Sequence, residues 1–251
     1  MPLDVARIRA LRPPNTVHYF ASISSTMTEA ARLAIAGAPH GTIVLAEEQT
    51  AGLGRLGRSW KSPSELGIYC SILLRLPLPP ASFPIASLML GLSTAEAIEK
   101  ATSLACDLRW PNDVLINERK VAGILTHLVE NCIVAGIGIN VNQISFPPDL
   151  RTPATSLCMA SDGQLQSREE ILEALLESVE LFSSMLSSEG VGSILRAFTS
   201  ASSYALNRRI VIEEDGSKGV TAGLDENGFL LVRSDSGRLE RLAAGGVRPD
   251  R

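Results

Sequence analysis

The chain has few of the side chains that bind structural metals. Its four cysteines, Cys70, Cys106, Cys132 and Cys158, are far apart, and no two of them have Cys-x-x-Cys spacing. Its three histidines, His18, His40 and His127, do not stand at metal-ligand spacing from a cysteine. This argues against a zinc site. Scattered thiols within apolar runs are typical of buried core residues in a reducing compartment, and we therefore expect a cytoplasmic protein.

The chain also lacks an excess of basic residues. Its 23 Lys and Arg are outnumbered by 27 Asp and Glu, which gives a formal net charge of −4. This argues against a general nucleic-acid-binding protein, but it leaves room for a local basic site. The first 14 residues contain no continuous apolar stretch and do not read as a secretory signal.

One segment carries no charge for the length of a membrane span, residues 76–95. Its first half contains Pro77, Pro79, Pro80 and Pro84, which would break a spanning helix. We expect a proline-rich loop followed by a core helix over about residues 84–101, and no membrane association.

The remaining patterns indicate an α+β fold, a mixed or antiparallel sheet with flanking helices. Strands are expected at residues 16–20, 41–48 and 67–76. A helix with a Thr-x-x-Glu capping box at Thr26 should end at Gly37. Four Val- and Ile-rich runs follow at residues 105–110, 113–117, 121–130 and 131–141, and their short connections favour antiparallel hairpins. Two more helices are expected over about 168–188 and 191–203.

The composition changes after about Asn207. Short apolar runs alternate there with Asp-Gly, Asn-Gly and Ser-Gly turns, a pattern typical of a small β-barrel or sandwich. We therefore predict a catalytic domain over residues 1–204 and a small β-domain over residues 205–251.

A glycine-rich, basic loop follows the second strand, with the sequence Gly-Leu-Gly-Arg-Leu-Gly-Arg at residues 52–58. Glycines let the backbone approach a ligand, and arginines neutralise phosphate with forked donors. No Gly-Lys-Ser/Thr follows, and no helix pattern follows, which excludes a standard phosphate loop and a dinucleotide fingerprint. The loop predicts a nucleotide clamp; a flexible turn is the competing interpretation.

Two further stretches carry candidate chemistry. Arg-Trp-Pro-Asn-Asp at residues 109–113 is either a plain β-turn or a braced turn that fixes an amide and a carboxylate. Lys120 is either a snorkelling surface charge or a second cation for a carboxylate or phosphate. In Gly-Ile-Gly-Ile-Asn at residues 136–140, small residues indicate close approach to something flat, either backbone or ligand. Asn140 is either a structural residue with a satisfied amide or a ligand contact, with an adenine edge or a metal-bound phosphate as its partner.

Together these stretches resemble the biotin protein ligases. The family's Gly-Arg-Gly-Arg-x-Gly-Arg loop stands at residues 52–58, its Lys-Trp-Pro-Asn-Asp turn at 109–113, its Lys-x-Ala-Gly-Ile-Leu strand at 120–125 and its Gly-x-Gly-Ile-Asn strand at 136–140. The Ala-Thr-Ser-Leu quartet at 154–157 is also similar. The resemblance extends from about Ser24 to the C-terminus, and it implies a class II synthetase-like catalytic domain with an SH3-like C-terminal barrel.

The resemblance further implies an ATP-dependent ligase that forms biotinyl-5′-AMP and transfers biotin to a lysine of a biotin carboxyl carrier protein. Arg55 and Lys120 would be its catalytic residues, with Mg²⁺ offsetting phosphate charge. The implied biotin site is Ser25, Thr26, Met27, Gln49, Gly52, Leu53, Gly54, Arg55, Lys120 and Gly123. The implied ATP site is Arg55, Arg58, Trp60, Asn112, Asp113, Lys120 and Asn140, and the implied magnesium ligands are Asp113 and Asn140.

Three positions depart from the family pattern. Leu53 and Arg109 stand where the family has arginine and lysine, and Met27 stands where asparagine is frequent. A contact at Leu53 must come from its backbone, Arg109 keeps the charge but not the shape, and a side-chain role at Met27 is in doubt. These departures are compatible with a ligase that binds biotin but turns over slowly.

Two further functions are compatible with the same motifs. One is a lipoate ligase or another acyl-adenylate-forming ligase, and the other is a nucleic-acid-binding module that uses the arginine-rich loop and the terminal barrel. Some relatives carry an N-terminal helix-turn-helix domain. The 23 residues before Ser24 are too few for one, so we expect no sequence-specific DNA binding. The protein is expected to be a monomer or a homodimer.

Overall fold

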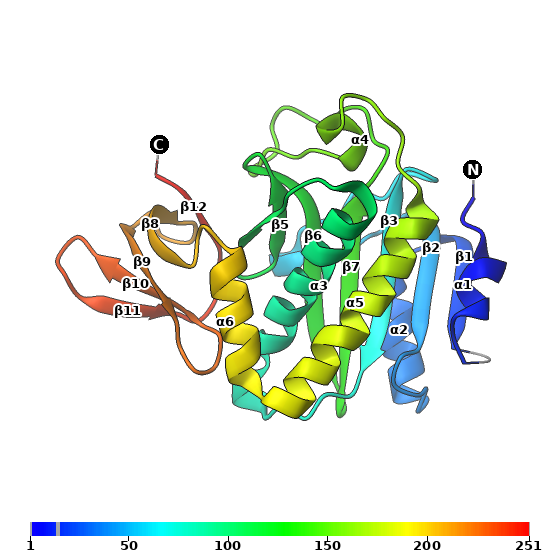
Figure 1. Ribbon diagram of the computed structural model, residues 1–251, viewed down its shortest axis with the longest axis horizontal. Coiled ribbons are helices and arrows are strands. Elements are labelled where there is room, and N and C mark those ends of the chain that lie inside the picture. Colours follow the sequence, from blue (N-terminus) through cyan, green and yellow to red (C-terminus); the bar gives the residue numbers. More distant parts are fainter. Residues whose placement is uncertain (1, 14–15, 251) are drawn as a thin grey trace.

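The computed structural model describes residues 2–13 and 16–250 and contains two β-sheets (Figure 1). The larger sheet has the strand order β1-β2-β3-β7-β6-β5-β4. Its strands are β1 (Val17–Ile23), β2 (Ile43–Gln49), β3 (Gly67–Leu74), β4 (Asp107–Arg109), β5 (Asp113–Ile116), β6 (Arg119–Val129) and β7 (Cys132–Asn140). Only β1 and β2 pair in parallel, and the other neighbours are antiparallel. The predicted mixed sheet is confirmed.

Helices cover both faces of this sheet. They are α1 (Val5–Ala10), α2 (Thr26–Ile35), α3 (Pro84–Thr102), α4 (Leu157–Ala160), α5 (Arg168–Glu189) and α6 (Val191–Ala201). Side chains alternate along β2, so Ile43 and Leu45 join the main core with α3 and α5, whereas Val44 packs with α2. Figure 1 shows α3 and α5 side by side across one face. The short helices α1 and α4 were not predicted.

The helix after the proline-rich loop is a core helix, as predicted. It begins at Pro84, and thirteen of its nineteen residues are buried. No helix in the described part of the chain is long and apolar enough to cross a membrane.

Helix α2 ends as expected but begins differently. Gly37 has a φ of +82° beyond the last turn, and its N–H donates to the Ala34 carbonyl, as in a glycine C-cap. The predicted capping box is wrong, because Ser25 is the N-cap and makes no side-chain cap bond. The Thr26 hydroxyl instead donates to Gln49 Oε1 at 3.0 Å, and it accepts from the Ser71 hydroxyl at 2.8 Å.

The second sheet is built from the C-terminal residues and has the order β11-β10-β9-β8-β12, all antiparallel. Its strands are β8 (Leu206–Ile212), β9 (Lys218–Leu224), β10 (Leu230–Ser234), β11 (Leu239–Leu242) and β12 (Val247–Pro249). It is attached to the larger part through Trp110, whose indole N–H donates to the Gly228 carbonyl at 3.0 Å. The second sheet begins where the domain boundary was predicted; independent folding of the two parts stays a prediction.

Candidate active site

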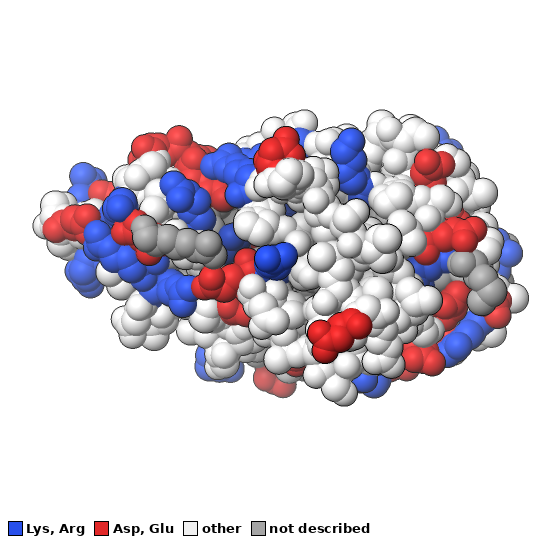
Figure 2. All heavy atoms as spheres, turned by 90° about the horizontal axis from the view of Figure 1, so that it is seen from above, with Lys and Arg blue, Asp and Glu red and all other residues white. Residues whose placement is uncertain are grey.

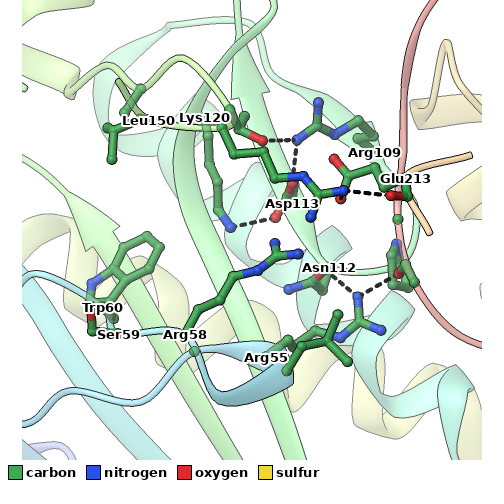
Figure 3. A pocket seen from close by; sticks show the side chains of 18 of the residues that line it. Arg55, Arg58, Ser59, Trp60, Arg109, Asn112, Asp113, Lys120, Leu150 and Glu213 are labelled. Atoms are coloured by element: carbon green, nitrogen blue, oxygen red, sulfur yellow. Dashed lines mark hydrogen bonds and ion pairs between the residues drawn. The ribbon is translucent and has the colours of Figure 1, made fainter. Parts of the chain in front are cut away.

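A cavity of about 260 Å³ lies where the two sheets meet (Figure 3). Its walls are the glycine-rich loop, the Trp-Pro turn between β4 and β5, the loop after β7 and the turn before β12. Among the residues that the structure describes, six cationic and two anionic side chains line it: Arg55, Arg58, Lys61, Arg109, Lys120 and Arg151, with Asp113 and Glu213. This surplus of four positive charges fits a polyanionic ligand such as a triphosphate.

Asp113 is the centre of an ion-pair group in this cavity. One of its carboxylate oxygens lies 2.5 Å from Lys120 Nζ, and the other lies 2.5 Å from a guanidinium nitrogen of Arg109. Burial by itself would raise the pKa of the Asp113 carboxyl, but Lys120 and Arg109 together outweigh burial and hold that pKa below its usual value. One carboxylate shared by two cations leaves a net positive charge at the cavity wall.

Arg109 also holds the loop after β7. The guanidinium group that contacts Asp113 donates to the Thr152 hydroxyl at 3.0 Å. The same loop pairs with the start of β6, where the Lys120 N–H donates to the Pro153 carbonyl and the Thr155 N–H donates to the Lys120 carbonyl. Arg109, at 5% exposed, is therefore a buried connector between Asp113 and this loop. Both bonds come from the same guanidinium nitrogen, and Arg109 keeps the positive charge of the family's lysine at this position.

Trp60 lies flat on the glycine face of the sheet. A Cβ added to Gly138 would lie 2.5 Å from the indole ring, and one added to Gly123 would lie 3.0 Å from it. Lys120 Nζ is 5.3 Å from the ring centroid, a cation–π contact. We expected a backbone or a ligand against this strand, and that expectation is wrong, because the Trp60 side chain lies in front of Gly138 and the Met27 side chain in front of Gly136. The indole N–H is buried and finds no partner among the described residues.

A second, inner cavity of about 50 Å³ lies beside the first. The two share Gly54, Arg55, Trp60, Asn112 and Lys120. Met27, Gly123 and Gly136 line the inner cavity, and the Met27 sulfur fills the space in front of Gly136. Its polar end is formed by Thr26 and Gln49, whose amide oxygen accepts from the Thr26 N–H and hydroxyl. The slot is thus mostly apolar, with polar groups at one end and cations at the other.

Most of the predicted biotin residues meet at this slot. Thr26, Met27, Gln49, Leu53, Gly54, Arg55, Lys120 and Gly123 line it. Two predicted residues line neither cavity. The Ser25 hydroxyl is buried with no partner in the described chain, and Gly52 packs against the Trp60 carbonyl, where a Cβ would lie 2.5 Å from the oxygen. The roles of all these residues in binding stay predictions.

The predicted nucleotide residues Arg55, Arg58, Trp60, Asn112, Asp113, Lys120 and Asn140 all line the larger cavity. Arg55 donates from one guanidinium nitrogen to Asn112 Oδ1 at 3.0 Å, and Asn112 Nδ2 donates to the Ile124 carbonyl. Figure 3 shows Arg58 extending into the space between Arg55 and Lys120. The Asn140 amide donates to the Thr155 carbonyl at 3.0 Å, so its partner is a backbone group.

The described residues do not form a resident metal site. Both oxygens of Asp113 already contact cations, and the Nδ2 of Asn140 is bound to a carbonyl. Within residues 2–13 and 16–250, no three His, Cys, Asp or Glu side chains gather as metal ligands. Magnesium ligation by Asp113 and Asn140 stays a prediction, and any such ion would arrive with the triphosphate as part of the substrate.

Sequence reasoning missed the contribution of the C-terminal sheet and of the loop before Ala154. Glu213, Gly245 and Gly246 line the larger cavity, as do Arg151 and Thr152. The only signal in the sequence was a Gly-Gly pair before the last strand, which is common in turns. Its proximity to Arg55 depends on the packing of two sheets and not on any local pattern.

Comparisons with known proteins identify the family to which the chain is similar. A model of the biotin/lipoate A/B protein ligase family matches residues 19–143. Two relatives are the biotin–[acetyl-CoA-carboxylase] ligases of Paracoccus denitrificans, 32% identical over 87% of this chain and 94% of the relative, and of Mycobacterium tuberculosis, 30% identical over 90% and 86%. The bifunctional ligase/repressor BirA of Bacillus subtilis is 35% identical over 87% of this chain and 70% of BirA.

A solved structure has the same fold. The biotin protein ligase from Aquifex aeolicus in complex with biotin and ATP superposes with a TM-score of 0.79 and 31% identity, over 93% of this chain and 98% of that one. Fold, motif order and relatives therefore agree, and the chain belongs to the biotin protein ligases of the biotin/lipoate ligase family.

Proposed function

We propose that this protein joins biotin to ATP, forming biotinyl-5′-AMP and pyrophosphate, and then transfers the biotin to a lysine of a biotin carboxyl carrier protein. The observation that carries the proposal is that Lys120 lies in both cavities, between a mostly apolar slot and a cation-lined space. A carboxylate at the end of the slot and a phosphate in the larger cavity would meet at this ammonium group.

The positive charges of the larger cavity suit the first step, the formation of the adenylate. A biotin carboxylate oxygen attacks the α-phosphorus of ATP, the bond from that phosphorus to the bridging oxygen breaks, and pyrophosphate leaves. Both reactants are anions, and the positive surplus around Lys120, Arg55 and Arg58 offsets their repulsion and stabilises the charge that develops at phosphorus. Magnesium, carried by the triphosphate, would supply further positive charge there.

The second step needs no covalent enzyme intermediate. The neutral amine of the acceptor lysine attacks the acyl carbon of the adenylate, AMP leaves with the electron pair of the acyl–oxygen bond, and the amine loses a proton. Until then the mixed anhydride must be kept from water. The glycine-rich loop and the loop after β7, which line the larger cavity from two sides, are the segments placed to exclude water.

The inner slot must widen to accept biotin. At about 50 Å³ it holds only a few water molecules. Trp60 closes one side of it and rests on glycines, and its indole N–H has no hydrogen-bond partner in the described chain. A shift of this ring is the simplest route to a larger slot. Because Trp110 is buried away from the slot, biotin binding should change the tryptophan fluorescence mainly through Trp60.

A nucleic-acid-binding role is not supported by the charges on the C-terminal sheet. In the view from above, basic and acidic side chains are interspersed over this sheet (Figure 2). Arg209 pairs with Asp235, and Lys218 pairs with Asp250, so their charges are locally balanced. A continuous basic face would be needed for tight binding to a phosphate backbone.

Mass spectrometry tests the proposed function. The purified protein is incubated with ATP, Mg²⁺ and an equimolar mixture of biotin, lipoate and octanoate, then desalted and analysed under native conditions. We expect a retained mass equal to biotinyl-AMP. Retention of lipoyl- or octanoyl-AMP instead would show that the protein activates a different acid. Retention of no adenylate would contradict the proposal.

A further inference from the structure

Two arginines from separate loops reach the same corner of the C-terminal sheet, which is formed by Glu213 after β8 and by Gly245 and Gly246 before β12. Arg55, in the glycine-rich loop, donates to the Gly245 carbonyl at 2.9 Å. Arg151, in the loop after β7, donates to the Glu213 carbonyl at 2.8 Å and lies 3.3 Å from the Glu213 carboxylate. All four residues line the larger cavity, and Figure 3 shows Arg55 and Glu213 at its wall. The two loops that border the cavity are thus tied to one place.

This corner is rigid for local reasons. Glu213 follows β8 and Gly245–Gly246 precede β12, and these two strands pair in register. The Glu213 N–H donates to the Gly246 carbonyl at 2.9 Å, which extends the ladder by one bond. Gly245 has a φ of +83°, and a Cβ there would lie 2.8 Å from the Glu214 carboxyl carbon. A positive φ of this size favours glycine, and the adjacent Glu213–Gly246 hydrogen bond holds the backbone next to the Gly245 carbonyl.

The corner also attracts Arg55 electrostatically. Burial lowers the pKa of the Arg55 guanidinium, and the carboxylates of Asp113, Glu213 and Glu214 oppose that shift while Arg58 adds to it. A partly desolvated cation gains more from a fixed carbonyl and nearby carboxylates than an exposed one does. The contact is therefore more than a chance surface hydrogen bond.

The C-terminal sheet is held in place by contacts that do not involve these loops. Trp110 donates to the Gly228 carbonyl, and Gly228 packs within van der Waals reach of Ile85 and Leu88 on α3. The Ser82 hydroxyl donates to Asn227 Oδ1 at 2.9 Å. The corner can therefore stay in position when a loop moves away from it.

The position of the loop after β7 depends on its contact with this corner. It is fixed at its end by the Arg109 bond to the Thr152 hydroxyl and by the backbone pairing of Pro153 and Thr155 with Lys120. Earlier in the same loop, Ile144 is 80% exposed and Leu150 is 38% exposed, so little packing holds this part down. Arg151 is the side chain that links it to the second sheet.

We propose that the C-terminal sheet is the fixed support that holds both loops over the cavity, with Arg55–Gly245 and Arg151–Glu213 as its two latches. The latches would retain the reactive adenylate until an acceptor lysine arrives, and this role rests on the proposed function. Arg151 and Glu213 are positioning residues, because they act on the loop and not on the reacting atoms. The latch itself is a physical contact that can be tested without any ligand.

The test compares Arg151→Met with Arg208→Met. Arg208 makes a 2.8 Å ion pair with Glu118 that also joins the C-terminal sheet to the larger one, but it lines neither cavity. Amide hydrogen exchange is measured on both ligand-free proteins. We expect exchange in residues 143–152 to be about fivefold faster in Arg151→Met, from loss of one charge-assisted hydrogen bond, and unchanged in Arg208→Met. Equal exchange in that loop for Arg151→Met and the unaltered protein would overturn the latch, whatever the protein catalyses.

A second measurement links the latch to retention. Biotinyl-AMP is formed on the protein without acceptor, and its release is followed by rapid desalting. Arg151→Met should release preformed adenylate about fivefold faster, and because release is followed only after the adenylate has formed, any effect of the lost charge on its formation does not enter the rate. Glu213→Gln should have a smaller effect, because the Glu213 backbone carbonyl still accepts from Arg151. Faster loop exchange with unchanged release would contradict the retention role, and failure to form any adenylate would count against the proposed function and not against the latch.

Discussion

Replacing Asp113 by asparagine removes the one carboxylate that Arg109 and Lys120 share. The substitution keeps the shape of the side chain and deletes its charge. Arg109 is 5% exposed, so its guanidinium group would stay largely buried without a carboxylate partner, whereas Lys120, at 22% side-chain exposure, can turn outward. Breaking a buried ion pair costs about 3–5 kcal/mol. Because Lys120 can relax, we expect a loss of about 3 kcal/mol in the free energy of unfolding.

For a chain of this size, about 3 kcal/mol corresponds to a lower unfolding temperature by about 6–12 °C. Thermal unfolding followed by circular dichroism at pH 7 measures it. The double variant Arg109→Met with Asp113→Asn should recover about 1–2 kcal/mol, because the stranded guanidinium is gone. Equal unfolding temperatures for Asp113→Asn and the unaltered protein would refute the reasoning.

The difference in the free energy of unfolding between the unaltered protein and Asp113→Asn should also depend on pH. The pKa of Asp113 is lower in the folded protein than its usual value. A carboxyl group of this kind stabilises the fold fully above its unfolded pKa of about 4, and that contribution is lost as the pH falls through the folded pKa. The gap between the two proteins should therefore be constant from pH 6 to 8 and narrow below about pH 4. A gap that widens on acidification would contradict this assignment.

Two glycine substitutions should change the free energy of unfolding in opposite directions. In Gly138→Ala the new Cβ would lie 2.5 Å from the Trp60 ring, so we expect a loss of about 1–3 kcal/mol of stability and a red-shifted tryptophan emission from a displaced indole. An unshifted emission would mean that Trp60 does not rest on this strand. In Gly91→Ala, inside α3, the new Cβ meets only ordinary contacts at 3.7 Å and 3.9 Å, and urea unfolding should show a gain of about 0.5–1 kcal/mol. A loss there would mean that α3 is packed more tightly than the structure shows.

Local patterns were sufficient for the strands and for the longer helices, but not for the short helices α1 and α4. The Val- and Ile-rich runs with short turns predict β4 to β7, and the glycines of β7 predict close approach to a flat group. They did not identify that group, because a backbone or a ligand was expected and a side chain lies there. Trp60 is far from Gly138 in the chain, and only the fold of the glycine-rich loop brings its ring onto the strand.

Side-chain partners were the least predictable part. Thr26 matched a capping box, but the helix begins one residue earlier than that motif requires, and Gln49 and Ser71 bind its hydroxyl. The sequence left open whether Asn140 is a structural residue or a ligand contact, and the Thr155 carbonyl, which lies beside it, accepts its amide N–H. The Arg55 contact with Gly245 joins residues 190 positions apart, which no local pattern encodes.

Biotin-dependent exchange of pyrophosphate into ATP tests the central claim most directly, since it reports only the step in which carboxylate meets α-phosphate. The unaltered protein should catalyse exchange with biotin and not with lipoate. Lys120→Ala, with its fold verified by circular dichroism, should lose about 100- to 1,000-fold in rate. Exchange at the unaltered rate in Lys120→Ala would contradict the claim that this ammonium group brings the two anions together.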